Sequence, residues 1–252
     1  MLGSSIKDGF RILDGNWLRI IGVVFLCYMI KLIAGTLPVQ GTVIINFDPL
    51  AVLNSETLVS LVLASVLNSF LFFIMVDYIT NTSYTMRRRF AKACAFPFQN
   101  WQLLYKGMVV FFLFNLLLTI IGMMTIYAAL GGLASIAGGS LTVLGLYGVL
   151  LLLFTGVVWL FLSISQVAYI LYDEPAAGIL SGLKQSISMM KGSRWPLLGL
   201  FLLMMVATML GALLIGIGAF VSIAIFEVVR LSFYKELLQK RRREEWHAKV
   251  NG

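Results

Sequence analysis

The stretch LVSLVLASVLNSFLFFIMVDYIT, residues 58–80, is followed a few positions later by the basic run Arg87-Arg88-Arg89. An apolar helix of about 20 residues crosses a hydrocarbon core of roughly 30 Å. This stretch contains a single charged residue, Asp77, close to its basic end. We therefore predict a transmembrane helix over 58–80 whose carboxyl end lies on the side of the arginines.

Five further apolar stretches are long enough to cross a membrane. They are 17–36, 107–130, 141–172, 197–215 and 218–234. Stretch 141–172 is longer than one crossing needs, so we expect it to tilt, to kink near Gly156 or to continue beyond the membrane. A tight turn at the two glycines of 216–218 separates the last two stretches. The predicted fold class is an all-α polytopic membrane protein, with one domain of six transmembrane helices and a basic cytoplasmic tail over 235–252.

The distribution of Lys and Arg sets the orientation. The connections 37–57, 131–140 and 216–218 contain neither residue. Of the 19 Lys and Arg residues, only Lys31 lies outside the segments at the opposite ends of the predicted helices. Basic residues collect on the cytoplasmic side of membrane proteins. The pattern predicts a multi-pass protein of a bacterial cell membrane with both termini in the cytoplasm.

Composition agrees with a membrane protein and indicates its partners. Hydrophobic residues make up 60% of the 252 positions, charged residues 12%, and the mean hydropathy is +0.95. The net charge is +8, but the basic residues form short runs between apolar stretches. Membrane lipids, anionic on the cytoplasmic side, are therefore the expected partners, and nucleic acid is not. Another membrane protein, or a second copy of the chain, is a further candidate. Cys27 and Cys94 are predicted to be free thiols.

The segments that lead into the first, third and fifth spans share a pattern. Each has a Trp at the joint, namely Trp17, Trp101 and Trp195. Short amphipathic stretches precede them, over 6–13, 89–96 and 175–190. One interpretation is an internal repeat of three hairpins, each preceded by an interfacial helix and anchored by its Trp. The other is chance, because Trp is common at membrane interfaces.

Four segments in the second half of the chain point to a family. They are YILYDEP (169–175), SISMMKGSRW (186–195), GIG (216–218) and RLSFYKEL (230–237). They resemble the DUF975 integral membrane proteins of Gram-positive bacteria over 154–237, and more weakly at GNW (15–17). The resemblance implies a six-span membrane protein and supplies no catalytic residues. Glu227 departs from the family, which tends to be apolar or aromatic at this position.

The sequence contains little that could carry out catalysis. His247 is the only histidine, so no His-based metal site or catalytic dyad can form within one chain. HExxH, P-loop, G-x-S-x-G and CxxC motifs are absent from the sequence. We therefore predict that the protein is not an enzyme and that it has no catalytic, cofactor-binding or metal site.

Ionisable residues at membrane depth are the remaining candidates, because they are costly there and often functional. Lys31 lies in the outer part of the first span, and Glu56 begins the second. A Lys31–Glu56 pair, or snorkelling of Lys31 to the outer headgroups, is one interpretation. The alternative is a cation that guards an outward cavity.

Glu227 and Arg230 form the second candidate site, near the middle of the sixth span. Their i, i+3 spacing allows an ion pair within one helix. Asp77 or Arg19, at the cytoplasmic ends of other spans, could join the pair as a structural cluster. The alternative is a site that senses protons or ions.

Small and polar residues predict some helix contacts. Ala207 and Gly211 in the fifth span, and Gly218 and Ser222 in the sixth, would let two helices approach closely. Asn68 and Asn115, in the second and third spans, would form a hydrogen bond between helices.

Three classes of function remain open on the sequence. The favoured class is a non-catalytic module that binds lipids or another membrane protein, as an accessory, scaffold, chaperone or self-protection factor. The second is a small transporter or lipid translocator, and the third an intramembrane enzyme. The first is favoured because polar groups at depth are few and no broken helix is expected to face a midplane site.

Overall fold

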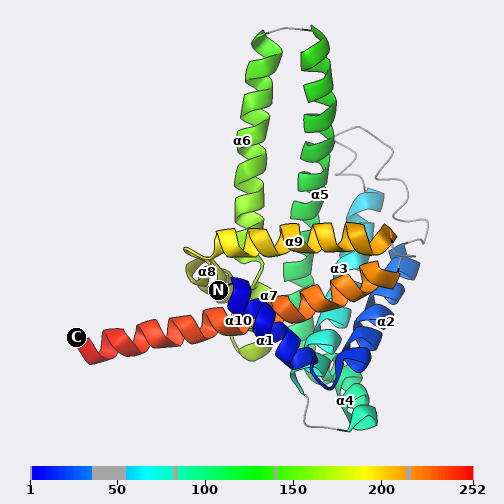
Figure 1. Cartoon of the computed structure of the whole chain (residues 1–252), viewed down its shortest axis with the longest axis vertical. Coiled ribbons are helices and arrows are strands. Elements are labelled where there is room, and N and C mark those ends of the chain that lie inside the picture. The colour runs from blue at the N-terminus through cyan, green and yellow to red at the C-terminus, as the bar shows by residue number, and fades with distance from the viewer. Residues whose placement is uncertain (1, 36–54, 82–84, 139–140, 214–216, 252) are drawn as a thin grey trace.

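The computed structural model describes residues 2–35, 55–81, 85–138, 141–213 and 217–251, and within these ranges all regular structure is helical (Figure 1). The helices are α1 (Leu2–Leu13), α2 (Trp17–Gly35), α3 (Ser55–Thr80), α4 (Met86–Gln99), α5 (Trp101–Gly138), α6 (Leu141–Ile164), α7 (Val167–Asp173), α8 (Ile179–Met189), α9 (Arg194–Leu213) and α10 (Ile217–Asn251).

Five apolar stretches in the described residues are long enough to cross a membrane. They are Trp17–Ala34, Leu58–Thr80, Trp101–Ile126, Gly148–Asp173 and Arg194–Leu213. The prediction of an all-helical, multi-pass membrane protein is therefore confirmed. The sixth predicted span, 218–234, lies within α10 and is not among the five. It contains Glu227 and Arg230, and α10 continues beyond it through a charged segment.

Several helices extend past their predicted ends. Helix α5 begins at Trp101 and continues to Gly138, so most of the predicted connection 131–140 is helical. Its 38 residues correspond to about 57 Å of helix. The predicted tail over 235–252 is likewise helical as far as Asn251. Neither segment contains a proline after its first turn, so the helical hydrogen bonds can continue unbroken.

Helix α3 is central to the core and packs against α2, α4 and α5. Asn68 Nδ2 donates to Asn115 Oδ1 at 3.4 Å, and Asn115 Nδ2 donates to Ser65 Oγ at 3.0 Å. The predicted hydrogen bond between these spans is confirmed. At Gly107, an added Cβ would lie 2.5 Å from the Phe73 ring. Helices α3 and α5 therefore pack too closely there for a larger residue.

The hairpin of α9 and α10 is held by small residues. An added Cβ at Gly211 would lie 2.4 Å from the Gly218 carbonyl carbon, and Ser222 Oγ donates to the Ala207 carbonyl at 3.1 Å. The predicted contact is confirmed. Because α10 begins at Ile217, Gly218 belongs to its first turn, and part of the predicted turn over 216–218 lies outside the described residues.

The two later hairpins lie in different directions. Helices α5 and α6 project away from the other helices, whereas α9 and α10 run across their lower part (Figure 1). Helices that cross one bilayer are tilted by about 0–40° from its normal. In this arrangement α9 and α10 do not line up with α5 and α6 as two membrane-crossing hairpins would.

Short helices precede the three predicted hairpins: α1, α4 and α8. The joints after α1 and α8 each contain a left-handed glycine, Gly15 with φ +71° and Gly192 with φ +78°. The middle joint uses Asn100, with φ −117°. Trp17, Trp101 and Trp195 are 55%, 69% and 70% exposed at these joints. The first and third joints are thus alike and the middle one differs, and the threefold repeat stays a prediction.

Two of the short helices can be compared with the amphipathic stretches predicted over 6–13 and 175–190. Helix α1 packs along α10, where Ser4 Oγ donates to Glu236 at 2.8 Å and an added Cβ on Gly9 would lie 2.8 Å from a Val229 methyl carbon. Helix α8 begins at Ile179, so Pro175 lies before it and not in its predicted first turn.

Candidate functional site

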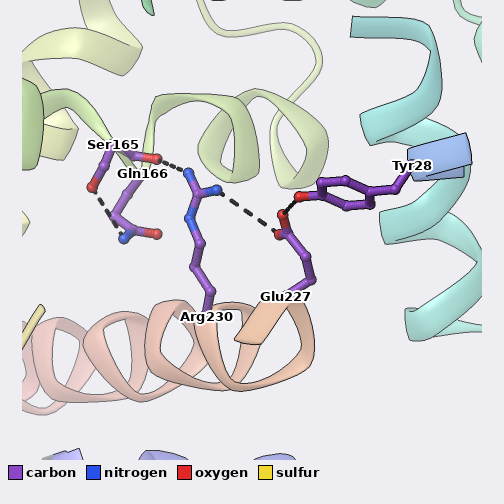
Figure 2. A network of polar contacts seen from close by, with 5 residues as sticks. All are labelled: Tyr28, Ser165, Gln166, Glu227 and Arg230. Atoms are coloured by element: carbon purple, nitrogen blue, oxygen red, sulfur yellow. Dashed lines mark hydrogen bonds and ion pairs between the residues drawn. The ribbon is translucent and has the colours of Figure 1, made fainter. Parts of the chain in front are cut away.

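A network of polar side-chain contacts connects α2, the junction of α6 and α7, and α10 (Figure 2). Tyr28 Oη donates a hydrogen bond of 2.6 Å to Glu227 Oε1. Arg230 Nη1 lies 3.9 Å from Glu227 Oε2, and Arg230 Nη2 donates to the Ser165 carbonyl at 3.0 Å. Glu227 is only 6% exposed. The carboxylate is therefore held by a hydroxyl from one helix and a guanidinium from its own helix.

A break between α6 and α7 supplies the acceptor for Arg230. Ser165 and Gln166 lie between the two helices, and the Ser165 hydroxyl donates to the Leu162 carbonyl at 2.8 Å. The last carbonyls of a helix lack partners within it, and a cation near them is favourable. Arg230 therefore binds at the end of α6 and fixes α10 against the break.

The break lies elsewhere than the sequence analysis considered. A kink near Gly156 was one of three possibilities for the long fourth stretch, and Gly156 lies within the continuous helix α6. The helix instead breaks where the Ser165 side chain bonds to the preceding turn, as serine hydroxyls do in competition with the backbone. The expectation that no broken helix faces the site was wrong.

Aromatic rings extend this network of contacts along α7. The Arg230 guanidinium lies 5.4 Å from the centre of the Tyr169 ring, and Tyr169 stacks on Tyr234 with ring centres 5.3 Å apart. Tyr234 Oη donates to Asp173 Oδ2 at 2.8 Å. A cation over an aromatic face is stabilised by the ring quadrupole. The Arg230 guanidinium thus interacts with a carboxylate, a carbonyl and an aromatic ring.

Some buried polar atoms at this junction have no hydrogen-bond partner among the described residues. They include Glu227 Oε2, Gln166 Oε1, Tyr169 Oη and Arg230 Nε. A buried polar atom without a partner costs about 1–3 kcal/mol. The polar contacts at this junction are therefore only partly completed by hydrogen bonds within the protein.

Asp77 belongs to a second cluster and does not join Glu227. Its Oδ1 accepts hydrogen bonds from Tyr172 Oη at 3.0 Å and from Asn81 Nδ2 at 2.7 Å. Arg19 instead donates to Asn16 Oδ1 at 3.3 Å. The hypothesis that Asp77 or Arg19 completes the Glu227–Arg230 pair is therefore wrong. The reason is position, because Asp77 lies at the end of α3 opposite Tyr172 at the end of α7.

Lys31 lies beside the network of polar contacts around Glu227. Its Nζ is 4.8 Å from the centre of the Tyr28 ring, and Tyr28 in turn binds Glu227. The two candidate sites of the sequence are thus linked through one tyrosine. The side chain of Glu56 lies outside those the structure describes, so the predicted Lys31–Glu56 pair stays a prediction.

Arg89, from the basic run that follows the second predicted span, is buried and packs against the end of α3. Arg89 is 3% exposed, and its Nε donates to the Tyr78 carbonyl at 2.6 Å. Its guanidinium also lies 4.2 Å from the centre of the Tyr78 ring. Burial lowers the pKa of Arg89, yet an arginine keeps its charge in proteins. Arg89 therefore closes the carboxyl end of α3, as Arg230 does for α6.

Sequence reasoning missed the residues that bind the ion pair from other helices. Tyr28 was missed, although it lies three residues before the predicted candidate Lys31 in a largely apolar stretch, which places the two on one helix face. Ser165 and Gln166 are adjacent polar residues inside the long fourth stretch. Both signals were present in the sequence. Their link to Glu227 was not, because it depends on how α10 packs.

Comparison with known proteins gives no further information: no family model, no curated protein and no solved structure matches this chain. Among the described residues, no group of three or more His, Cys, Asp and Glu side chains could hold a metal ion. Cys27 and Cys94 are free thiols in the structure.

Proposed function

We propose that this protein is a non-catalytic integral membrane protein that binds lipids or another membrane protein, as an accessory, scaffold or self-protection factor. The observation that carries the proposal is the pairing of its buried charges. Glu227 is held by Tyr28 and Arg230, and Arg230 also binds the Ser165 carbonyl. Each of these charges contacts an oppositely charged or polar group from the protein itself, which supports a structural role in holding α2, α6 and α10 together, although Glu227 Oε2 and Arg230 Nε have no hydrogen-bond partner among the described residues.

The exposed apolar surface supports this proposal. Leu152 on α6 is 75% exposed and Leu213 on α9 is 82% exposed, and similar side chains line both helices. Such surface is solvated by lipid chains or covered by a neighbouring membrane protein. Membership of the DUF975 family, which the sequence suggests, stays part of the proposal, because no family model matches the chain.

The proposed layout has six spans with both termini in the cytoplasm of a bacterial cell. It rests on the asymmetry of Lys and Arg. The transverse course of α9 and α10 makes their hairpin the part to test. Single cysteines at the exposed positions Gly145, Leu213 and Ser181, in a chain without Cys27 and Cys94, should be treated in intact cells with an impermeant thiol reagent.

In the six-span layout, cysteines at Gly145 and Leu213 react from outside, and the cysteine at Ser181 reacts only after lysis. Reaction of the Leu213 position only after lysis would replace the third hairpin by two helices that lie along the inner face. Reaction of the Ser181 position in intact cells would contradict the orientation itself.

A second candidate function is a small transporter or lipid translocator. The helix break at Ser165 and Gln166 favours it, because broken helices often form substrate sites in transporters. The buried polar atoms Gln166 Oε1 and Tyr169 Oη, which have no hydrogen-bond partner among the described residues, would belong to such a site.

Liposomes of defined lipid composition that contain the purified chain distinguish the two functions. One set carries a pH-sensitive dye, and another carries labelled phospholipid whose exposure a membrane-impermeant reductant reports. We expect proton flux and lipid exchange equal to those of liposomes without protein. Flux or exchange that Glu227→Gln abolishes, while thermal stability in detergent is unchanged, would make the transporter the better assignment.

For the binding function itself, the chain should be purified from native membranes with its retained lipids and proteins identified. Glu227→Gln preserves a hydrogen bond from Tyr28, so we expect this variant to retain the same set of molecules. A purified wild-type chain that retains neither lipid nor another protein would contradict the proposal.

A further inference from the structure

The charged face of α1 forms one wall of an open groove. The other walls come from the first turns of α2 and from α10, and the groove has a volume of about 620 Å³. Ligand pockets in proteins range from about 300 to 1,000 Å³. The wall is firmly placed, because Gly9 packs directly on Val229 and Ser4 is hydrogen-bonded to Glu236.

Four charged side chains line the α1 side of the groove: Lys7, Asp8, Arg11 and Asp14. All four are exposed. Among the described residues, none of them has a side-chain hydrogen bond or an ion pair. In contrast to Glu227 and Arg230, these charges remain available to a ligand.

The opposite side of the groove is apolar. Ile21 on α2 and Val221 and Ile225 on α10 line it. Trp17, which is 55% exposed and predicted to lie at the headgroup level, also lines the groove. A ligand that fits must therefore have a charged end and an apolar end.

The signs of the four charges further restrict which headgroups can bind in the groove. Two cations and two carboxylates give the groove a formal charge of zero. A purely anionic headgroup would pair with Lys7 and Arg11 but would be repelled by Asp8 and Asp14. A headgroup with one phosphate and one primary ammonium complements both kinds of side chain.

We infer that this groove binds a single phospholipid whose headgroup carries a phosphate and a primary ammonium, as phosphatidylethanolamine does. The phosphate accepts hydrogen bonds from Lys7 and Arg11, the ammonium donates to Asp8 and Asp14, and the acyl chains run over Ile21, Val221 and Ile225. The inference rests on the proposed binding function and specifies its ligand class.

Native mass spectrometry of the full chain tests this assignment. The protein is released from mixed micelles that hold equal amounts of phosphatidylethanolamine, phosphatidylglycerol and phosphatidylcholine. We expect one retained lipid, with the ethanolamine lipid preferred about tenfold over the glycerol lipid, as expected for hydrogen bonds to charged groups. Phosphatidylcholine should bind less well, because its quaternary ammonium donates no hydrogen bond.

Two double variants separate the headgroup contacts. Lys7→Ala with Arg11→Ala should reduce retention of every phospholipid about tenfold. Asp8→Asn with Asp14→Asn should retain lipid but lose the preference for ethanolamine. Lys184→Ala with Lys191→Ala removes an exposed basic pair outside the groove and serves as the control, which should bind as the wild type does.

Filling the apolar side provides an independent measurement. Ile225→Trp should abolish the stoichiometric lipid, and unchanged melting of the lipid-free variant shows that it folds. A wild-type preference for phosphatidylglycerol, or equal losses in the control and the Lys7/Arg11 variant, would overturn the inference. A chain that selects no aminophospholipid but still co-purifies with a membrane protein would overturn this inference and leave the proposed function intact.

Discussion

The α5–α6 hairpin and the α9–α10 hairpin were both predicted to cross the membrane, but their second helices differ in charge and in surroundings. Between Gly107 and Ile164, α5 and α6 contain no charged residue, and their apolar side chains such as Leu152 are exposed. Helix α10 instead buries Glu227 and Val229 and packs against α1, α2 and α9 over its middle part. Helices α5, α6 and α9 are surrounded mainly by whatever solvates the molecule, whereas the middle of α10 is surrounded mainly by protein.

This difference shows what hydropathy measures. An apolar stretch indicates that a helix avoids water, but not whether lipid or protein surrounds it. Charged residues in such a stretch carry the missing information, because they need partners in protein. Glu227 and Arg230 therefore identify α10 as an internal helix, and the lack of charges in α6 agrees with a lipid-facing one.

The largest expected effect tests whether α10 is internal. Arg230→Ala removes the cation that faces Glu227 and the donor to the Ser165 carbonyl. Loss of one partner of a buried ion pair costs about 3–5 kcal/mol, because the other charge remains without compensation. We expect the melting temperature in detergent to fall sharply and the yield of folded protein to drop.

The double variant Arg230→Ala with Glu227→Gln is the control for this measurement. It removes both charges and keeps the bond from Tyr28, so much of the lost stability should return. If Arg230→Ala melts like the wild type, α10 is not enclosed by protein and the contrast between the two hairpins is lost.

The next effect compares one glycine in each hairpin. Gly211→Ala places a Cβ 2.4 Å from the Gly218 backbone, so α9 and α10 must separate. Overpacking of this kind costs about 1–3 kcal/mol. Gly156→Ala in α6 meets no atom within 4 Å, and it should gain up to about 1 kcal/mol from helix propensity.

Melting curves of both glycine variants in the same detergent provide the measurement. Opposite shifts would support a close contact in one hairpin and an open surface in the other. Destabilisation by Gly156→Ala would mean that a partner, such as a second copy of the chain, covers α6.

Much of the fold follows from the sequence, because length and apolarity determine membrane helices almost by themselves. Five apolar helices long enough to cross a membrane, the Asn68–Asn115 contact and the close approach of small residues in the last hairpin were predicted, whereas the sixth span stays a prediction. The course of α10 was not, because no periodicity indicates that α1 packs along it or that Tyr28 reaches Glu227. The hydrogen bond from Arg230 to the Ser165 carbonyl joins residues that are 65 positions apart in the sequence. Contacts over that distance require the packed structure.

The smallest expected effect compares two hydroxyl groups. The Ser222 hydroxyl in α10 lies within hydrogen-bond distance of the Ala207 carbonyl across the hairpin, at 3.1 Å, and of the Gly218 carbonyl in its own helix, at 2.9 Å, whereas Thr155 Oγ1 in α6 donates only within its own helix, to the Leu151 carbonyl at 2.8 Å. A hydrogen bond between membrane helices contributes about 0.6 kcal/mol on average. Ser222→Ala should therefore lower the stability by roughly that amount. Thr155→Val should leave it unchanged, because the Leu151 carbonyl keeps its backbone partner and a valine fits an exposed apolar surface. Reversible unfolding in mixed micelles, with several repeats of each variant, can resolve such a difference. A larger loss for Thr155→Val than for Ser222→Ala would reverse the comparison and place α6, rather than α10, inside a protein contact.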